Sequence, residues 1–369
     1  MNPSHDLSHQ NKPKPKAVIV GGSIAGVSCA HALILVGWDV VVIEKSRRPP
    51  KGNPTGAGLA LDPLSQELIG SWTGHPELLH DITSPAAIDL NQAINDEKSR
   101  KILARDENFN HRAAHWSSLH DHLFSALPPE IFLWGHLFLS FSVSSDKRSV
   151  KIRAQVLDTE ETAEVDGDLL VAADGWNSLI RKHYFPDIKR RYSGYCAWRG
   201  VLDTIGNSVT MKVSDEMIQK MYQDAEKIWH PTFVQVMRET KEPFVNAIYD
   251  CDPPERIVWD NVVLVGDAAH PTTPHSSRST NMSILDAAVL GRCLEKLGSE
   301  NLTAALEEYQ SIRLPVASKQ VLHARRVGRI KQGLELPDRK SFNPNTANWE
   351  ECEMLQLRAV PFFGHNPLF

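Results

Sequence analysis

"AVIVGGSIAGVSCAHALILVGWDVVVIEKS" is the sequence of residues 17–46, and it decides the fold class. The apolar run 17–20 predicts a buried strand, and the glycines on either side of Ser23 predict a tight turn. A helix is expected over 25–36, and a second strand over 39–43 that ends at Glu44. A strand, a turn, a helix and a second strand in this order predict an α/β protein.

The turn and the end of the second strand form a dinucleotide-binding pattern in which Ser23 replaces the second glycine of G-x-G-x-x-G. Gly21 allows the tight turn and Gly26 allows close helix–strand packing, so a pyrophosphate can approach the helix N-terminus, where the dipole favours negative charge. Glu44 follows Gly21 by 23 residues and is placed to accept both ribose hydroxyls. The predicted cofactor-binding residues of this unit are Gly21, Gly22, Ser23, Ile24, Ala25, Gly26, Glu44 and Lys45.

Two later stretches repeat the pattern of a buried strand followed by a loop. "LLVAADGWNSLIRKHY" (169–184) has a strand ending in Asp174-Gly175, and "NVVLVGDAAHPTTPHSSRSTNMSILDAAVLG" (261–291) has a strand ending in Gly266-Asp267. Each alone is consistent with an aspartate that caps a turn. In this order and together with the first unit, they predict one nucleotide-binding fold.

With these three motifs the chain resembles the FAD-dependent aromatic hydroxylases of the p-hydroxybenzoate hydroxylase fold. Within that class it is most similar to the 2,6-dihydroxypyridine hydroxylase-like and plant FAD-dependent monooxygenases. The motifs span residues 17–292 of the 369. The resemblance implies a Rossmann-like FAD-binding domain of the GR2 type, a smaller antiparallel β-sheet substrate domain and C-terminal helices.

The resemblance also assigns roles to the motif residues. The first turn and Glu44 would hold the ADP half of FAD, and Asp174-Gly175 would support both FAD and the nicotinamide cofactor. Gly266, Asp267 and Ala268 would bind the ribityl-pyrophosphate region, and the helix after Asn281 would point its N-terminus at the flavin. The family's phosphate-binding arginine is Trp116 here; Arg112, one turn earlier, either replaces it or is a solvated arginine.

The activity implied by the resemblance is hydroxylation of a small aromatic or heteroaromatic substrate with NAD(P)H and O2, through a flavin hydroperoxide. The catalytic candidates are His270, Pro271 and His275, on the loop expected beside the flavin ring. His275 is either an acid or base, or an ordinary loop histidine. We expect no metal site, because His111 and His115 have no accompanying ligand set and are predicted to lie on a partly exposed helix face.

Two departures from the family concern activity. The loop usually written P-x-G-G-Q-G-x-N reads PHSSRSTN over 274–281, so it has no glycine to allow close backbone approach to the flavin. Only 66 residues separate Gly200 from Gly266, which predicts a shortened substrate domain. The alternatives are therefore a flavin-binding but catalytically impaired homologue, or an NAD(P)H oxidase or reductase without oxygen insertion.

Charge and composition limit the kinds of partner that this chain is expected to bind. A net charge of −5 and a pI near 6.3 disfavour nucleic acid, and no apolar run approaches the length of a membrane span. Five cysteines without a C-x-x-C pair favour a reducing compartment, and we expect a cytoplasmic protein. The oligomeric state is not predicted.

The expected domain organisation is discontinuous. Residues 1–16 are expected to be a disordered arm, and 336–369 a C-terminal tail. The FAD-binding domain is expected over 17–75, 100–185 and 255–335, and the substrate domain over 76–99 and 186–254. Further expected elements are strands over 140–172 and 195–203, helices over 111–127, 211–225 and 283–297, and a helix pair over 302–332 broken at Pro315.

Overall fold

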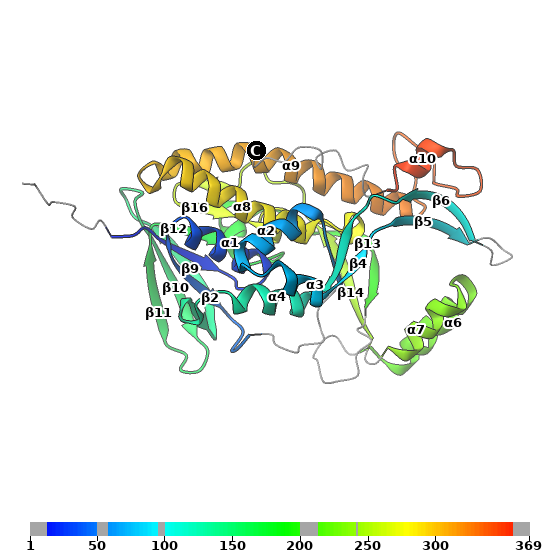
Figure 1. Cartoon of the computed structure of the whole chain (residues 1–369), viewed down its shortest axis with the longest axis horizontal. Coiled ribbons are helices and arrows are strands. Elements are labelled where there is room, and N and C mark those ends of the chain that lie inside the picture. Colours follow the sequence, from blue (N-terminus) through cyan, green and yellow to red (C-terminus); the bar gives the residue numbers. More distant parts are fainter. Residues whose placement is uncertain (1–12, 50–57, 95–99, 200–212, 241–242, 357–369) are drawn as a thin grey trace, which may run out of the picture.

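The computed structural model describes residues 13–49, 58–94, 100–199, 213–240 and 243–356 of the 369. Within these residues a six-stranded sheet has the strand order β15-β16-β12-β1-β2-β8 and forms the centre of the fold (Figure 1). Its pairs are parallel except that β15 runs antiparallel to β16. The strands are β1 (Lys16–Val20), β2 (Asp39–Glu44), β8 (Phe132–Trp134), β12 (Leu169–Ala172), β15 (Val258–Trp259) and β16 (Val262–Leu264).

The unit predicted from the opening stretch is confirmed. β1 leads into α1 (Ile24–Leu35), which returns the chain to β2 in parallel register with β1. The apolar runs of β1 and β12 are almost completely buried, as expected for parallel strands that are covered on both faces. The predicted α/β class therefore follows from a sheet whose strands are continuous hydrophobic runs.

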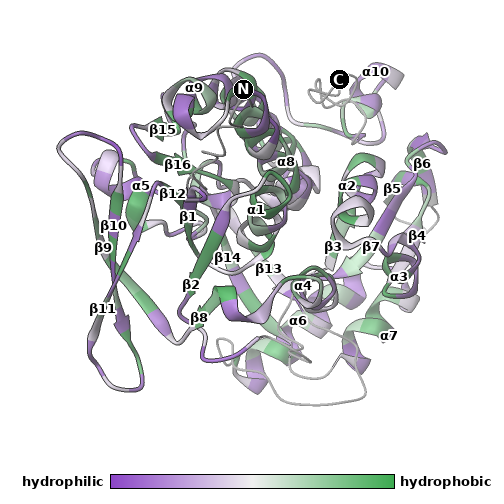
Figure 2. Ribbon diagram, turned by 60° about the vertical axis from the view of Figure 1, so that its left-hand side comes forward, coloured by the Kyte–Doolittle hydropathy of each residue, from purple (hydrophilic) through white to green (hydrophobic). Residues whose placement is uncertain are grey.

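Two layers cover the two faces of the central sheet. α1 and α8 (Ser279–Leu297) lie on one face, and an antiparallel sheet of β9, β10 and β11 lies on the other (Figure 2). α1 and α8 approach closely at Gly291, where an added Cβ would lie 3.1 Å from the backbone oxygen of Ala32. The strands of the outer sheet are β9 (His136–Val143), β10 (Val150–Val156) and β11 (Thr162–Gly167), which confirms the strands expected in this region.

The expected break at Pro315 is wrong. α9 (Leu302–Lys331) is one continuous helix, with Pro315 in its interior. Proline removes one backbone hydrogen bond, but buried residues on both sides of it, including Tyr309 and Val321, hold the helix in place by packing. Tertiary contacts therefore outweigh the local breaking signal.

The helix expected over 111–127 is wrong for its first five residues. β7 (His111–His115) pairs antiparallel with β3 (Gly58–Leu61) on one side and β4 (Thr83–Ala86) on the other. The helix α4 begins only at Trp116 and ends at Ser125. Pairing with two strands that are distant in sequence overrides the helical spacing.

The remaining elements lie around the central sheet and at the far end of the molecule (Figure 1). β13 pairs antiparallel with β14, and α6 and α7 extend away from them. The expected strand over 195–203 is confirmed up to Arg199, and the expected helix over 211–225 is confirmed from Asp215. Residues 200–212, and residues 1–12 of the expected arm, lie outside the described ranges. These elements are α2 (Pro63–Thr73), α3 (Pro76–Asp81), β5 (Asp89–Ile94), β6 (Arg100–Asp106), η1 (Pro129–Ile131), α5 (Leu179–Tyr184), β13 (Arg191–Arg199), α6 (Asp215–Ile228), α7 (Pro231–Glu239), β14 (Phe244–Asp250), η2 (Gly266–Ala268), η3 (Pro274–Ser276), η4 (Ser299–Asn301) and α10 (Trp349–Glu353).

None of the helices in the described ranges is both long and apolar enough to cross a bilayer.

Candidate functional site

The turn between β1 and α1 requires glycine at two positions. Gly21 has a φ of +104°, and a Cβ on it would lie 2.3 Å from the carbonyl oxygen of Ala173. A Cβ on Gly26 would lie 1.9 Å from the carbonyl oxygen of Gly21. The turn therefore packs backbone against backbone at the carboxyl ends of β1 and β12. Ile24 is the first residue of α1, whose first N–H groups have no acceptor within the helix.

Glu44 is fixed over this turn from the end of β2. Its Oε2 accepts a hydrogen bond of 2.7 Å from the N–H of Gly22, and its Oε1 accepts one of 2.8 Å from the N–H of Ser46. Each oxygen of a carboxylate can accept a second hydrogen bond. The carboxylate is thus oriented by the backbone and retains acceptor capacity, while Lys45 beside it is exposed.

His120 of α4 also holds the turn, and sequence reasoning missed it. Its Nε2 lies 2.7 Å from the carbonyl oxygen of Gly22, and burial lowers the pKa of the imidazole. The two residues are 98 positions apart. No local pattern could have identified this contact, because it arises only when α4 packs against α1.

Asp174 and Gly175 follow β12, as predicted. Asp174 Oδ2 accepts a hydrogen bond of 2.8 Å from the N–H of Leu179. Its Oδ1 is buried with no hydrogen-bond partner among the described residues, and burial raises the pKa of the carboxyl group. Gly175 has a positive φ of +76°. A buried acceptor without a donor is the state expected of a group that binds a ligand hydroxyl.

Gly266 and Asp267 lie beside the starts of α1 and α8. A Cβ on Gly266 would lie 2.8 Å from the Cβ of Ala25 and 2.9 Å from Ser283 Oγ. Asp267 Oδ1 accepts a hydrogen bond of 2.6 Å from the hydroxyl of Ser279, which opens α8. The residues of the first and third motifs, far apart in sequence, therefore meet in one place.

Arg181 belongs to the second motif, without a role assigned from sequence, and it links that motif to the third. It is almost completely buried, and its guanidinium donates hydrogen bonds of 2.9 Å and 2.7 Å to the carbonyl oxygens of Asp267 and Ala268. A third bond goes to the carbonyl oxygen of Trp176. This arginine therefore fixes the backbone of both aspartate motifs relative to each other.

His270, a catalytic candidate, lies in a buried ionic cluster beneath the third motif. Its Nε2 is 2.6 Å from Asp286 Oδ2, and Arg313 Nε donates to the other oxygen of Asp286 at 2.7 Å. Burial alone would raise the pKa of Asp286, but the charges of His270 and Arg313 outweigh it and hold that pKa at about 2. Asp286 also accepts from the N–H of Gly266. Through this bond the cluster holds the backbone of the third motif in place. Pro271, next to His270, is buried.

His275, the other histidine candidate, is packed against α9. A Cβ on Gly328 would lie 2.5 Å from the imidazole Cδ2, and the ring of Tyr195 is 5.1 Å away between centroids. Burial, together with the charge of Lys331, lowers the pKa of His275 to about 4. The imidazole is therefore neutral at physiological pH.

Side chains fix the loop that has lost its glycines. Ser276 Oγ accepts a short hydrogen bond from the amide of Gln320, and Ser277 adopts the left-handed region with a φ of +52°. Arg278 is buried; its guanidinium lies 3.2 Å from Asp62 Oδ2, and burial lowers its pKa to about 10. Asn281 Oδ1 accepts from the N–H of Asp62. These contacts replace glycine flexibility with a specific polar network.

Arg112 is bound by neighbouring elements, and its role as a phosphate ligand stays a prediction. It lies on β7, and its guanidinium donates to the hydroxyl of Thr83 at 2.6 Å and to the carbonyl oxygens of Thr83 and His80. These bonds hold α3 and β4 to β7. The predicted helical face for His111 and His115 is wrong, since both lie on this strand; among the described residues no three His, Cys, Asp or Glu side chains are grouped to hold a metal.

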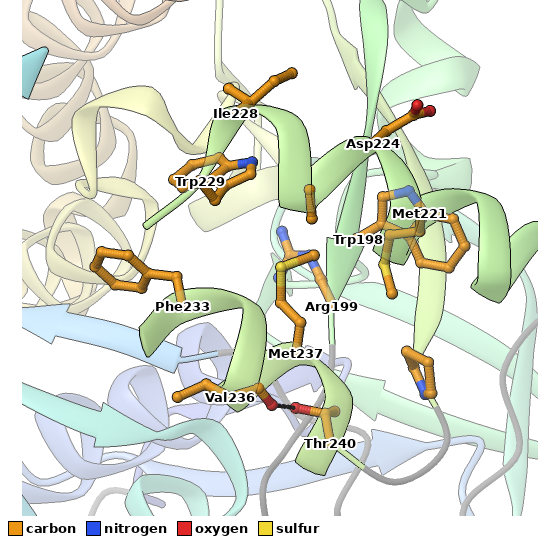
Figure 3. Close-up of a pocket in the computed structure, with 12 residues that line it drawn as sticks. Trp198, Arg199, Met221, Asp224, Ile228, Trp229, Phe233, Val236, Met237 and Thr240 are labelled. Atoms are coloured by element: carbon orange, nitrogen blue, oxygen red, sulfur yellow. Dashed lines mark hydrogen bonds between the residues drawn. The ribbon is translucent and has the colours of Figure 1, made fainter. Parts of the chain in front are cut away.

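An apolar pocket of about 580 Å³ lies apart from these motifs, and sequence reasoning missed it entirely. Its walls come from the end of β13 and from α6 and α7, with aromatic rings and methionines facing one another (Figure 3). Arg199 and Asp224 are the charged residues of its lining. Its lining includes Trp198, Met221, Ile228, Trp229, Phe233 and Met237.

The residues of the three motifs fit FAD. The glycine turn leaves no room for a side chain at the end of β1, Glu44 can accept ribose hydroxyls, and the buried Asp174 Oδ1 needs a donor. Asp267 has a fixed carboxylate at the start of α8, where a helix N-terminus favours negative charge. A dinucleotide with hydroxyl groups and a pyrophosphate meets these requirements.

Comparison with known proteins also points to FAD. The family of FAD binding domains matches residues 254–324. The 6-hydroxynicotinate 3-monooxygenase of Pseudomonas fluorescens is 24% identical over 83% of this chain and 89% of that enzyme, and the aurachin C monooxygenase/isomerase of Stigmatella aurantiaca is 32% identical over 46% of this chain and 53% of that enzyme. The crystal structure of HpxO from Klebsiella pneumoniae with FAD and uric acid covers 97% of this chain and all of its own, with a TM-score of 0.74 and 19% identity. Over most of its length, the chain is therefore similar in sequence to 6-hydroxynicotinate 3-monooxygenase and in fold to HpxO, and its residues 254–324 match the FAD binding domain.

Proposed function

We propose that this protein is a FAD-dependent monooxygenase that uses NAD(P)H and O2 to hydroxylate a small aromatic or heteroaromatic molecule. The observation that carries the proposal is the glycine turn closed by Glu44, since it is shaped for the ADP half of the cofactor. The relatives named above support the substrate class, because one is a 6-hydroxynicotinate monooxygenase and a structural neighbour binds uric acid.

In this proposal the protein's own residues bind and orient. Glu44 accepts the ribose hydroxyls, Asp174 accepts a hydroxyl at its buried oxygen, and Asp267 holds the ribityl-pyrophosphate region. The chemistry that FAD supplies when bound is transfer of electrons from NAD(P)H and activation of O2. The chain would exclude water and place the substrate.

The proposal keeps the discontinuous FAD-binding domain and a shortened substrate domain around β13 and β14. It also keeps a cytoplasmic location, which is supported by five cysteines that all lie in described residues as free thiols. The substrate and O2 are the proposed partners.

Purified full-length protein tests the proposal. We expect a yellow flavin spectrum at one FAD per chain, either as isolated or after addition of FAD. NADH or NADPH consumption should rise with a phenolic or hydroxypyridine substrate, and mass spectrometry should find a product heavier by one oxygen atom. A protein that remains colourless in excess FAD would refute the cofactor assignment.

A second candidate is a flavin-binding homologue with impaired catalysis, or an oxidase or reductase that does not insert oxygen. It is favoured by β13, which has β14 as its one partner strand in the described residues, and by the open apolar pocket beside it. In the same assay this candidate predicts bound FAD and hydrogen peroxide without an oxygenated product, or no NAD(P)H consumption.

A further inference from the structure

A second, polar pocket lies between β13, the C-terminal end of α9 and the segment after Asp267. Its volume is about 240 Å³, which corresponds to about eight water molecules. None of its lining residues is among the predicted cofactor-binding residues, and Thr273 lies on the loop between Pro271 and His275. The polar side chains that line it include Arg191, Ser193, Tyr195, Thr273, Arg325 and Arg329.

A bulge in β13 forms one wall of this polar pocket. The register of β13 against β14 shifts between Tyr192 and Cys196, so Ser193, Gly194 and Tyr195 have no partner residue on β14. Gly194 has a φ of +90°, and the amide of Gln332 at the end of α9 lies 3.4 Å from the carbonyl oxygen of Ser193. A bulge redirects side chains out of the sheet, and here they line a pocket shared with α9.

The pocket has more positively charged groups around it than negatively charged groups. The carboxylate of Asp250 is completely buried and accepts from Arg191 at 2.8 Å and from Arg325 at 2.9 Å, and Arg325 also pairs with Asp252 at 2.7 Å. Arg329 forms no ion pair within the described residues, and its Nε is buried with no hydrogen-bond partner there. Three guanidinium groups thus face two carboxylates, and the surplus charge is that of Arg329.

Three hydroxyl groups in the same pocket are also buried without a partner among the described residues: Ser193 Oγ, Tyr195 OH and Thr273 Oγ1. Thr273 is only 2% exposed. Each unsatisfied buried polar group costs about 1–3 kcal/mol, so four in one small pocket require an explanation. All four can donate a hydrogen bond, and arginine can only donate. The matching ligand offers several acceptors and a negative charge.

We propose that this pocket binds a small carboxylate, at a site separate from the FAD site. A carboxylate matches the planar guanidinium of Arg329, and its oxygens can accept from the hydroxyls of Tyr195 and Thr273. Tyr192 and Leu334 also line the pocket and can contact a short apolar group on the ligand. The inference goes beyond the proposed hydroxylation, since it does not depend on FAD.

The test is a ligand-observed NMR titration of the full-length protein with butyrate, which is not aromatic and so does not resemble the proposed substrate. We expect saturable binding of butyrate, at least tenfold weaker binding of the uncharged butyramide, and no change when FAD is added to saturation. Arg329→Gln should weaken butyrate binding at least tenfold, and Thr273→Val about fivefold. Arg326→Gln is the matched control, because Arg326 lies about one turn before Arg329 on α9 and its guanidinium pairs with Asp338 outside the pocket. This variant should change the affinity less than twofold.

Four results would overturn the proposal. Equal losses in Arg329→Gln and Arg326→Gln would indicate general electrostatic attraction. Loss of butyrate binding on addition of FAD would make the pocket part of the cofactor site. Binding of inorganic phosphate but not butyrate would exclude a carboxylate site, and absence of saturable binding would mean that the pocket holds water only. Thermal unfolding of each variant verifies that it is folded.

Discussion

The hydroxyl of Ser279 donates a 2.6 Å hydrogen bond to the carboxylate of Asp267. Ser279 stands where the family resemblance leads us to expect glycine, so this contact results from the replacement itself. A hydrogen bond to a charged acceptor contributes about 1.5–3 kcal/mol. The serine therefore competes for the carboxylate that we assign to the ribityl-pyrophosphate region of FAD.

Substitutions at these two positions should have opposite effects on FAD. Asp267→Ala should abolish FAD retention in a folded protein, since it removes the acceptor. Ser279→Ala should lower the Kd for FAD by up to about tenfold, because it removes only the competing donor. Fluorescence quenching of FAD during titration measures both values. Weaker binding in Ser279→Ala would show instead that the serine positions Asp267 for the cofactor.

Glu44 should contribute to FAD binding through the ribose hydroxyls. Glu44→Ala is expected to weaken the binding of FAD by roughly 1.5–3 kcal/mol, which is the contribution of a hydrogen bond to a charged acceptor. Glu44→Gln keeps the shape and an acceptor oxygen, so it should lose less. Circular dichroism controls for the fold, since Glu44 also accepts from Gly22 and Ser46. Unchanged affinity in Glu44→Ala would place the ribose elsewhere.

His275 should make the protein less stable in mild acid. Its pKa is lowered from 6.5 to about 4 in the folded protein, so between these values the unfolded chain binds a proton that the folded chain does not. The free energy of unfolding therefore falls as the pH drops from 6.5 to 4, by up to about 3 kcal/mol from this residue. His275→Phe removes the titration and should flatten this part of the profile.

Urea unfolding of wild type and His275→Phe at pH 7, 5.5 and 4.5 measures that difference. The comparison is between the two slopes against pH, because other buried histidines titrate in both proteins. His80→Gln, at an exposed histidine, is the control and should leave the slope as in wild type. Parallel profiles for wild type and His275→Phe would contradict the assignment.

The parts of the fold that sequence predicted are those set by local chemistry. The strand, turn and helix of residues 16–35 follow from an apolar run and from glycines that backbone contacts require. Glu44 ends a strand, and Asp174 and Asp267 follow strands; strand ends at one edge of a parallel sheet lie close together. Sequence therefore predicts the elements and site residues whose positions depend on a single segment of the chain.

The errors and omissions involve contacts between distant segments. His120 reaches Gly22 across 98 positions, and Arg278 reaches Asp62 across 216, so neither pair leaves a local pattern. The expected helix over 111–127 rests on helical spacing of apolar residues, and it is wrong over β7 because the partner strands β3 and β4 are distant in sequence. The contacts of Arg112 with Thr83 and His80 also join segments that are distant in sequence.

Ser277 should be the most readily improved residue of the glycine-free loop. Its φ of +52° lies in the left-handed region, which costs an ordinary residue about 1–2 kcal/mol and glycine much less. Ser277→Gly should therefore raise the free energy of unfolding by about 0.5–1 kcal/mol, after the greater entropy of glycine in the unfolded chain is subtracted. Chemical denaturation of the protein without FAD measures this directly.

Ser276→Gly is the matched substitution, because it makes the same chemical change one residue earlier. Ser276 does not have a positive φ, it is buried, and its hydroxyl accepts from the amide of Gln320. Loss of that bond leaves a buried amide donor unsatisfied and should destabilise the protein by about 1–3 kcal/mol. Opposite signs at the two serines are expected if backbone conformation limits Ser277 and hydrogen bonding determines Ser276. A loss of stability in both variants would show that the loop depends on its side chains at each position.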